Sequence, residues 1–294
     1  MTAATNLAGL EPKDLMIAGI SVHYYAGGAG EPLLLLHGLA GASGNWVELL
    51  PDLVRRHRVI AVDLPGHAGS GKAPRGTSID DFAAVAAAVL EAEVDGPALV
   101  AGHSFGGLVA LRLARARPDL VRGLLLVSPA GIRTTTRFTR SLVLASTTVR
   151  PGRWVAPLRH RYAGRSWYRR AVFRPWFVSD ATAVTERATH GLLGAQREHT
   201  DTKTAARAMN ADDPRPDLAE VACPVVILWG ARDPQLPLDD AFEYTRRLGA
   251  RLRVVADCGH LVIVERPSAC LDALAELSRG LRPVRVIDRV GIGD

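Results

Sequence analysis

Apolar residues recur along this chain with two different spacings. Short apolar runs rich in strand-forming residues occupy 15–17, 21–25, 32–36, 59–62, 98–101, 124–127, 225–228 and 252–255. Between them, three- and four-residue spacing predicts helices over 45–54, 82–93, 106–117, 239–248 and 268–281, the first of them kinked at Pro51. This alternation is typical of an α/β protein in which helices cover both faces of a mostly parallel sheet.

The alternation breaks off after the strand over 124–127. From residue 131 to about 216 no comparable strand run occurs, although three of the five tryptophans lie there. We therefore expect a discontinuous core over 1–132 and 213–294, with a helical cap over 133–212 inserted between its halves. Residues after 283 lack a clear pattern, and we expect a loose tail there.

Composition places the chain among ordinary water-soluble proteins. Hydrophobic residues make up 48% and charged residues 22%, and no apolar stretch approaches the roughly 18 residues that a membrane span needs. Residues 1–14 hold no apolar run of signal-peptide length. The three cysteines form no C-x-x-C pair, which fits a reducing compartment, and we expect a cytoplasmic location.

Positive charge is concentrated in the expected cap. Residues 133–200 hold thirteen arginines and three acidic residues, so this segment carries +10 and the remainder −4 of the net +6. Two interpretations stay open: contact with an anionic substrate or a peripheral membrane surface, or a merely solvated arginine-rich face. The aromatic residues of the cap also have two possible interpretations: they line an apolar substrate chamber, or they hold the cap together. No recognised binding motif accompanies the charge, so nucleic acid is not expected as a partner.

A five-residue motif stands where the strand over 98–101 meets the next helix. Gly102-His103-Ser104-Phe105-Gly106 fits G-x-S-x-G, in which the serine occupies a strained turn and projects its hydroxyl above the sheet. A chance match is the alternative in a chain rich in alanine and glycine, and the placement between strand and helix argues against it. Ser104 is therefore the candidate nucleophile.

A serine hydroxyl needs a base within reach and an acid that orients this base. Asp233 follows the strand over 225–228 and is the candidate acid, with Asp257 or Asp239 as the replacement if Asp233 only caps a turn. His260 follows the final strand, unlike the other eight histidines, and is the candidate base. Nearby Cys258 is expected to be a buried, inert thiol.

Acyl transfer also needs N–H donors for the developing oxyanion, each contributing about 2.7 to 4 kcal/mol to lowering the barrier. The candidates are the backbone amide of Phe105, directly after the nucleophile, and that of Leu39, in the loop after an early strand. Gly38 and Gly41 allow this loop to bend inward.

The chain resembles the α/β-hydrolase superfamily from about residue 15 to 281, in its serine-nucleophile branch of esterases and lipases with a helical cap. The resemblance is carried by His37-Gly38, the loop 63–67, the motif around Ser104, Trp229-Gly230 with Asp233, and Gly259-His260 with Glu265-Arg266-Pro267. It implies an eight-stranded sheet, a lid inserted after the sixth strand, and no cofactor.

The expected activity is hydrolysis of a carboxylic ester, or a related thioester or lactone, in a small apolar acyl substrate. Ser104 argues against haloalkane dehalogenases and epoxide hydrolases of this fold, which carry an aspartate nucleophile. One open alternative is a carbon–carbon bond hydrolase of the meta-cleavage group, which usually has a tryptophan after the histidine where this chain has Leu261. The other is a non-catalytic receptor that keeps the pocket.

Overall fold

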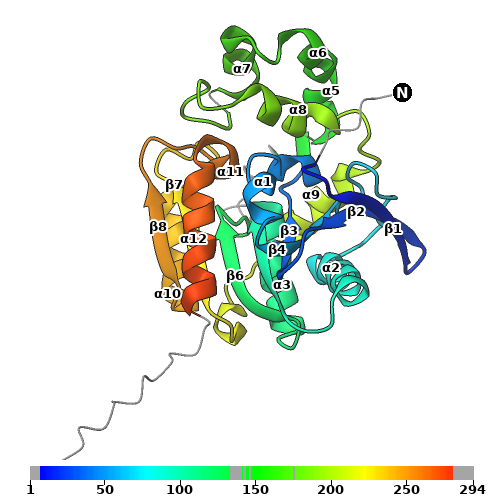
Figure 1. Ribbon diagram of the computed structural model, residues 1–294, viewed down its shortest axis with the longest axis vertical. Coiled ribbons are helices and arrows are strands. Elements are labelled where there is room, and N and C mark those ends of the chain that lie inside the picture. Colours follow the sequence, from blue (N-terminus) through cyan, green and yellow to red (C-terminus); the bar gives the residue numbers. More distant parts are fainter. Residues whose placement is uncertain (1–6, 133–140, 142–143, 146, 175, 281–294) are drawn as a thin grey trace, which may run out of the picture.

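The centre of the molecule is an eight-stranded sheet in the order β1-β2-β4-β3-β5-β6-β7-β8 (Figure 1). The computed structural model describes residues 7–132, 141, 144–145, 147–174 and 176–280. The strands are β1 (Glu11–Ile17), β2 (Ile20–Gly27), β3 (Glu31–Leu36), β4 (His57–Val62), β5 (Ala98–His103), β6 (Val121–Val127), β7 (Val225–Gly230) and β8 (Arg251–Val255). β2 is antiparallel to β1 and β4, and all other pairs are parallel. The predicted mostly parallel α/β sheet is confirmed.

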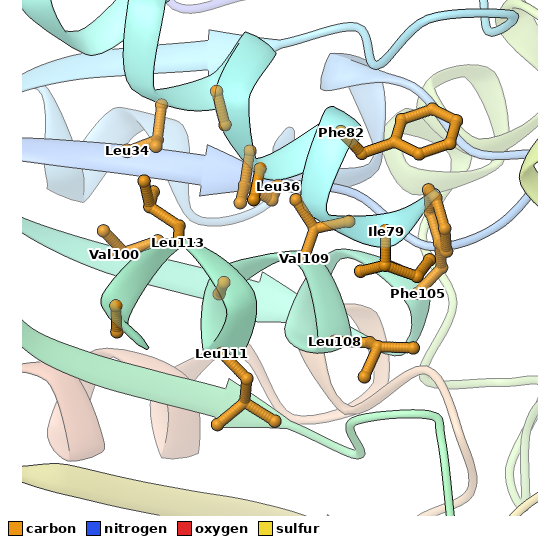
Figure 2. Packing of buried hydrophobic residues seen from close by; sticks show 14 of the residues in the cluster. Leu34, Leu36, Ile79, Phe82, Val100, Phe105, Leu108, Val109, Leu111 and Leu113 are labelled. Carbon is orange, nitrogen blue, oxygen red and sulfur yellow. The ribbon is translucent and has the colours of Figure 1, made fainter. Parts of the chain in front are cut away.

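Helices cover both faces of this sheet. One layer consists of α2 (Ile79–Glu93), α3 (Phe105–Ala116), α9 (Thr202–Ala211) and α10 (Leu238–Leu248), and the other of α1 (Leu50–Leu53), α11 (Val262–Glu265) and α12 (Pro267–Gly280). Successive strand residues point to opposite faces, so Leu34 and Leu36 pack in the first layer and Leu33 and Leu35 in the second. Figure 2 shows Leu34 and Leu36 among α2 and α3 side chains. The inner strands β3 to β7 are apolar on both sides for this reason.

The prediction of one kinked helix over 45–54 is wrong. That stretch begins with a 3₁₀ turn, η1 (Ser43–Trp46), and continues into the separate short helix α1. Pro51 lies in the first turn of α1, where its missing N–H costs no helical hydrogen bond. The proline therefore begins a helix instead of bending one.

Between β6 and β7, helices make up all the regular structure in the part of the chain that is described. They are α5 (Gly152–Val155), η3 (Ala156–Leu158), α6 (Arg159–Tyr162), α7 (Ser166–Phe173), α8 (Glu186–Gly194) and α9, followed by the 3₁₀ turn η4 (Leu218–Glu220). Figure 1 shows α5, α6 and α7 at one end of the molecule, with α8 between them and the sheet. α8 and η1 meet at two glycines, since a Cβ on Gly191 would lie 2.3 Å from the Gly44 carbonyl oxygen.

The boundaries of the cap, 133 and 212, stay a prediction. α9 lies inside them, yet Ala205, Ala208 and Met209 belong to the same apolar cluster as α2 and α3. We use "cap segment" below for residues 133–212. The predicted tail after residue 283 lies outside the described residues, and none of the described helices is both long and apolar enough to cross a bilayer.

Candidate active site

The turn between β5 and α3 holds Ser104 in a strained conformation. Its φ is +52° and its ψ −114°, a backbone region that non-glycine residues rarely adopt. Two hydrogen bonds to the end of β6 hold the turn, because the Ser104 amide donates to the Val127 carbonyl (2.9 Å) and the Ala130 amide to the Ser104 carbonyl (3.0 Å). A Cβ on Gly102 would lie 2.4 Å from the Gly106 carbonyl oxygen. Strand and helix thus meet only because glycine is present.

Asp233 and His260 form a buried pair beyond the ends of β7 and β8. Asp233 Oδ2 lies 2.7 Å from His260 Nδ1, and the two side chains are only 1% and 4% exposed. Asp233 Oδ1 also accepts from the amides of Gln235 (2.8 Å) and Leu236 (2.9 Å). Burial opposes ionisation of this carboxyl, but the electrostatic interaction and hydrogen bond with His260, together with these N–H donors, outweigh it and lower its pKa. Asp233 therefore both shapes its turn and orients the imidazole.

The two alternative acids are exposed residues. Asp257 is exposed and forms an ion pair with Arg232 at 2.6 Å. Asp239 lies exposed in the first turn of α10, where a carboxylate suits the helix dipole. The carboxylate in contact with the His260 imidazole is that of Asp233.

Ser104 and His260 are linked through the residue before the serine. The His103 ring lies 4.9 Å from the His260 ring, and His103 Nε2 donates to the His260 carbonyl oxygen at 3.0 Å. Burial lowers the pKa of His103 to about 3, so the ring is neutral at physiological pH. Among the described hydrogen bonds none joins the Ser104 hydroxyl to His260, and such bonds often tighten only when substrate binds. Ser104 is partly exposed, as is Asp233 when its whole residue is considered, whereas His260 is buried.

The loop after β3 runs directly past the serine. A Cβ on Gly38 would lie 3.0 Å from His103 Nδ1 and 3.4 Å from Ser104 Cβ. The amides of Leu39 and Phe105 donate no hydrogen bond within the described residues. Phe105 is the first residue of α3, so its N–H is among those that a helix leaves unsatisfied. Both donors are therefore available to an oxyanion.

A carboxylate to which sequence reasoning assigned no role fixes the histidine loop. Glu265 is 3% exposed and accepts hydrogen bonds from the amides of Gly259 (3.0 Å), Ser179 (2.9 Å) and Asp180 (3.3 Å). Burial raises its pKa, and these donors oppose the rise. The local signal was an acidic residue closing the apolar run 261–265. No sequence pattern indicated that the amides of Ser179 and Asp180 donate hydrogen bonds to it.

The cap segment reaches both sides of the site. On the histidine side, the Phe177 carbonyl accepts from the amides of His260 (2.8 Å) and Leu261 (3.2 Å). On the other side, the Ala40 carbonyl accepts from Gln196 Nε2 (2.8 Å) and His199 Nε2 (3.0 Å). The position of each loop thus depends on contacts with the cap segment.

The Cys258 thiol fits the expectation of an inert residue. Its side chain is buried, and burial raises its pKa to about 12. A thiol with such a pKa is not ionised at neutral pH.

The three cap tryptophans fit neither of the interpretations that the sequence left open. Trp154, Trp167 and Trp176 are 78%, 57% and 67% exposed, so they neither line an enclosed chamber nor fill the cap interior. Tyr168 and Phe173 do fill it, at 2% and 4% exposure.

Comparison with known proteins places the whole site within one family. Residues 31–267 match the family model described as alpha/beta hydrolase fold. The chain is 31% identical over 256 residues to the dihydrolipoyllysine-residue acetyltransferase component of the acetoin cleaving system of Cupriavidus necator, covering 85% of this chain and 64% of that protein. It thus spans less than two thirds of that relative's length.

Other relatives match nearly from end to end. The pimeloyl-[acyl-carrier protein] methyl ester esterase of Nitrosomonas europaea is 28% identical, with 86% of this chain and 99% of the relative covered. Hydrolases of 2-hydroxy-6-oxo-hexa-2,4-dienoic acids also match, at 26% and 27% identity. Among solved structures, a lipase from Acinetobacter baumannii superposes with a TM-score of 0.76 at 23% identity over 94% of this chain and 93% of that chain. At that identity the superposition supports the fold alone.

Proposed function

The chain belongs to the α/β-hydrolase fold family and is an enzyme of hydrolase type, and on that premise we propose that it cleaves a carboxylic ester, thioester or lactone through an acyl-enzyme. Ser104 Oγ attacks the acyl carbon while His260 Nε2 takes its proton. The amides of Leu39 and Phe105 stabilise the oxyanion. His260 then returns the proton to the leaving group, and a water molecule activated by His260 hydrolyses the acyl-enzyme.

The buried contact between Asp233 and His260 carries this proposal. With Nδ1 held 2.7 Å from a carboxylate, the imidazole keeps its proton on Nδ1 and presents Nε2 as the base. Burial of the carboxylate keeps water from competing for the bond. A structural aspartate at this turn would need only the two amide contacts of its Oδ1.

A fluorophosphonate probe tests the nucleophile, because it labels only activated serines. We expect the natural chain to be labelled and Ser104→Ala to stay unlabelled. Ser278→Ala is the matched control, since Ser278 lies near the far end of α12 and contacts Glu31 at 3.2 Å. Labelling of Ser104→Ala, or none of the natural chain, would refute the assignment. The second outcome would favour the receptor alternative.

A panel of p-nitrophenyl esters of rising chain length then measures the acyl specificity. The ester reaction is supported by the full-length match to a methyl ester esterase. The matches to hexadienoic acid hydrolases keep carbon–carbon cleavage as the second candidate, although Leu261 departs from the tryptophan usual there. If the protein turns over a 2-hydroxy-6-oxodienoate faster than every ester, carbon–carbon cleavage becomes the first candidate and ester hydrolysis the second.

We further propose that the protein works in the cytoplasm and that residues 133–212 form its cap. The location is supported by the three cysteines, all of which are free thiols. Fluorescence of a tagged chain in its native host tests it.

A further inference from the structure

The outer end of the cap segment combines unpaired positive charge with exposed apolar side chains. Residues 150–179 contain eight arginines and no acidic residue. We use "cap tip" for the exposed side chains of Trp154, Leu158, Arg161, Arg165, Trp167 and Arg170, which lie on the helical turns α5 to α7. In Figure 1 these turns form the end of the molecule beyond the carboxyl ends of the strands. The cap tip therefore faces solvent.

The arginines of 150–179 differ from most of those of the core in lacking a carboxylate partner. In the described part of the chain, none of the eight has a carboxylate within ion-pair distance. Arg159 and Arg169 donate to backbone carbonyls of their own neighbourhood, at 2.8 Å and 3.0 Å. Most of the described core arginines instead bind carboxylates, as Arg58 does with Glu93 and Arg112 with Asp212. An arginine-rich composition alone does not produce this contrast.

The tryptophans show the same contrast. Trp46 and Trp229 of the core are completely buried, whereas Trp154 is 78% and Trp167 57% exposed. Large apolar side chains that gather on the surface of a soluble protein mark a contact with another partner. Leu158, also exposed at 47%, follows Trp154 by four residues, a spacing that places both on one side of consecutive helical turns.

Arginine and tryptophan meet at one shallow hollow of the cap tip. Ser166, Trp167, Arg170 and Ala171 line a depression of about 340 Å³. The Trp167 ring stands 5.2 Å from the Tyr162 ring, whose face is covered by the Arg161 guanidinium at 5.5 Å. The guanidinium of Arg170 can donate hydrogen bonds to a phosphate, and the adjacent indole of Trp167 offers an apolar surface to acyl chains.

We propose that the cap tip docks the protein on an anionic lipid bilayer. Tryptophan prefers the interface between lipid headgroups and acyl chains, and arginine binds the phosphates above it. The complementary charge selects bilayers with acidic headgroups. Double-stranded DNA would satisfy the arginines but would leave Trp154 and Leu158 without apolar contacts, so the bilayer suits both kinds of side chain. This docking is independent of the reaction at Ser104.

Co-sedimentation of the full chain with lipid vesicles tests the proposal. We expect binding to vesicles of phosphatidylcholine with phosphatidylserine, weak binding to phosphatidylcholine alone, and a steep loss with added salt. The Ser104→Ala chain should bind equally well, which separates this test from that of the hydrolase activity. Equal binding to both vesicle types, or binding that ignores salt, would overturn the proposal.

Two triple variants with the same change of net charge locate the surface. Arg161→Gln, Arg165→Gln and Arg170→Gln together should weaken binding about 100-fold, since each basic residue near an anionic membrane contributes roughly fivefold. The control combines Arg75→Gln, Arg207→Gln and Arg279→Gln, three exposed arginines outside the cap tip that also have no ion-pair partner among the described residues. It should bind like the natural chain. Equal losses in both variants would mean that total charge alone acts, and the proposal would fail.

Tryptophan fluorescence gives a second readout that a general charge effect does not change. On anionic vesicles the emission of the natural chain should shift to shorter wavelength, and Trp154→Ala with Trp167→Ala should abolish most of the shift, because Trp46 and Trp229 are already buried. An unchanged shift in that variant would contradict docking through the cap tip. Retention of vesicle binding by the arginine variant, with loss of binding to a DNA duplex, would replace the bilayer by nucleic acid.

Discussion

Removing the Glu265 carboxylate tests how the histidine loop is held. Glu265→Ala leaves the amides of Gly259, Ser179 and Asp180 without their acceptor. A buried donor that loses its partner costs about 1 to 3 kcal/mol, and water can replace the carboxylate at the half-buried Ser179 and Asp180. The main cost is then that of the buried Gly259 amide, so we expect a loss of about 1 to 3 kcal/mol in the free energy of unfolding.

The same variant should slow the reaction more than it weakens substrate binding. Gly259 precedes His260, so a loop released by a fraction of an ångström displaces Nε2 from the serine, and misplacement of about 1 Å costs roughly 100-fold in kcat. Urea unfolding measures the stability, and ester hydrolysis separates kcat from KM. Glu265→Gln keeps one acceptor oxygen for Gly259 and Ser179 and should recover most of the activity.

Glu276→Ala is the matched control on α12. Its carboxylate pairs with Arg251 at 2.9 Å and with Arg253 at the surface, and each such pair contributes at most about 1 kcal/mol. Its kcat should not change. If Glu265→Ala unfolds at the same urea concentration as the natural chain and keeps its kcat, the Glu265 carboxylate does not hold the histidine loop in place.

Three further variants or conditions address the rest of the site. Asp233→Asn should lower kcat by about 10⁴-fold with little change in KM, because the amide favours the wrong tautomer of His260; a small loss would return the acid role to another carboxylate. Gly38→Ala should lower kcat about 100-fold by pushing the Leu39 amide away from the oxyanion, and unchanged kinetics would exclude this loop from the oxyanion hole. Stability should fall as the pH drops below 6.5, because burial lowers the pKa of His37, His67, His103 and His199 to about 3 and only the unfolded chain takes up protons in that window. Each ring contributes up to about 1.4 kcal/mol per pH unit, and urea unfolding that is independent of pH between these limits would contradict the burial of neutral rings.

The strands and the order of the chemical groups could be read from the sequence because their signals are local. The buried strands β5 and β7 are short apolar runs, and Ser104 and Asp233 each follow one of them. His260 follows β8, a less buried strand whose apolar residues are interrupted by Arg253. The failed helix over 45–54 has a local cause too, since apolar spacing does not tell whether Pro51 bends a helix or begins one.

The support of the site could not be predicted because it joins distant parts of the chain. Glu265 and Ser179 are separated by 86 residues, and no spacing rule relates them. The exposure of Trp154 and Trp167 was equally hidden, since an aromatic-rich segment reads alike whether its rings face inward or outward. Both the hydrogen bonds of Glu265 and the exposure of these tryptophans depend on contacts between residues far apart in the sequence.

The bonds of Phe177 and Ala40 limit how this enzyme can admit a substrate. A lid that swung fully away would break the amide contacts of His260 and Leu261 with Phe177 and would release the Ala40 carbonyl from Gln196 and His199. The widely open molecule would then lose the geometry of both loops and be unable to react. We therefore expect substrate to enter and product to leave through small local displacements of the cap segment. Only the closed arrangement of the cap segment would then be able to catalyse the reaction.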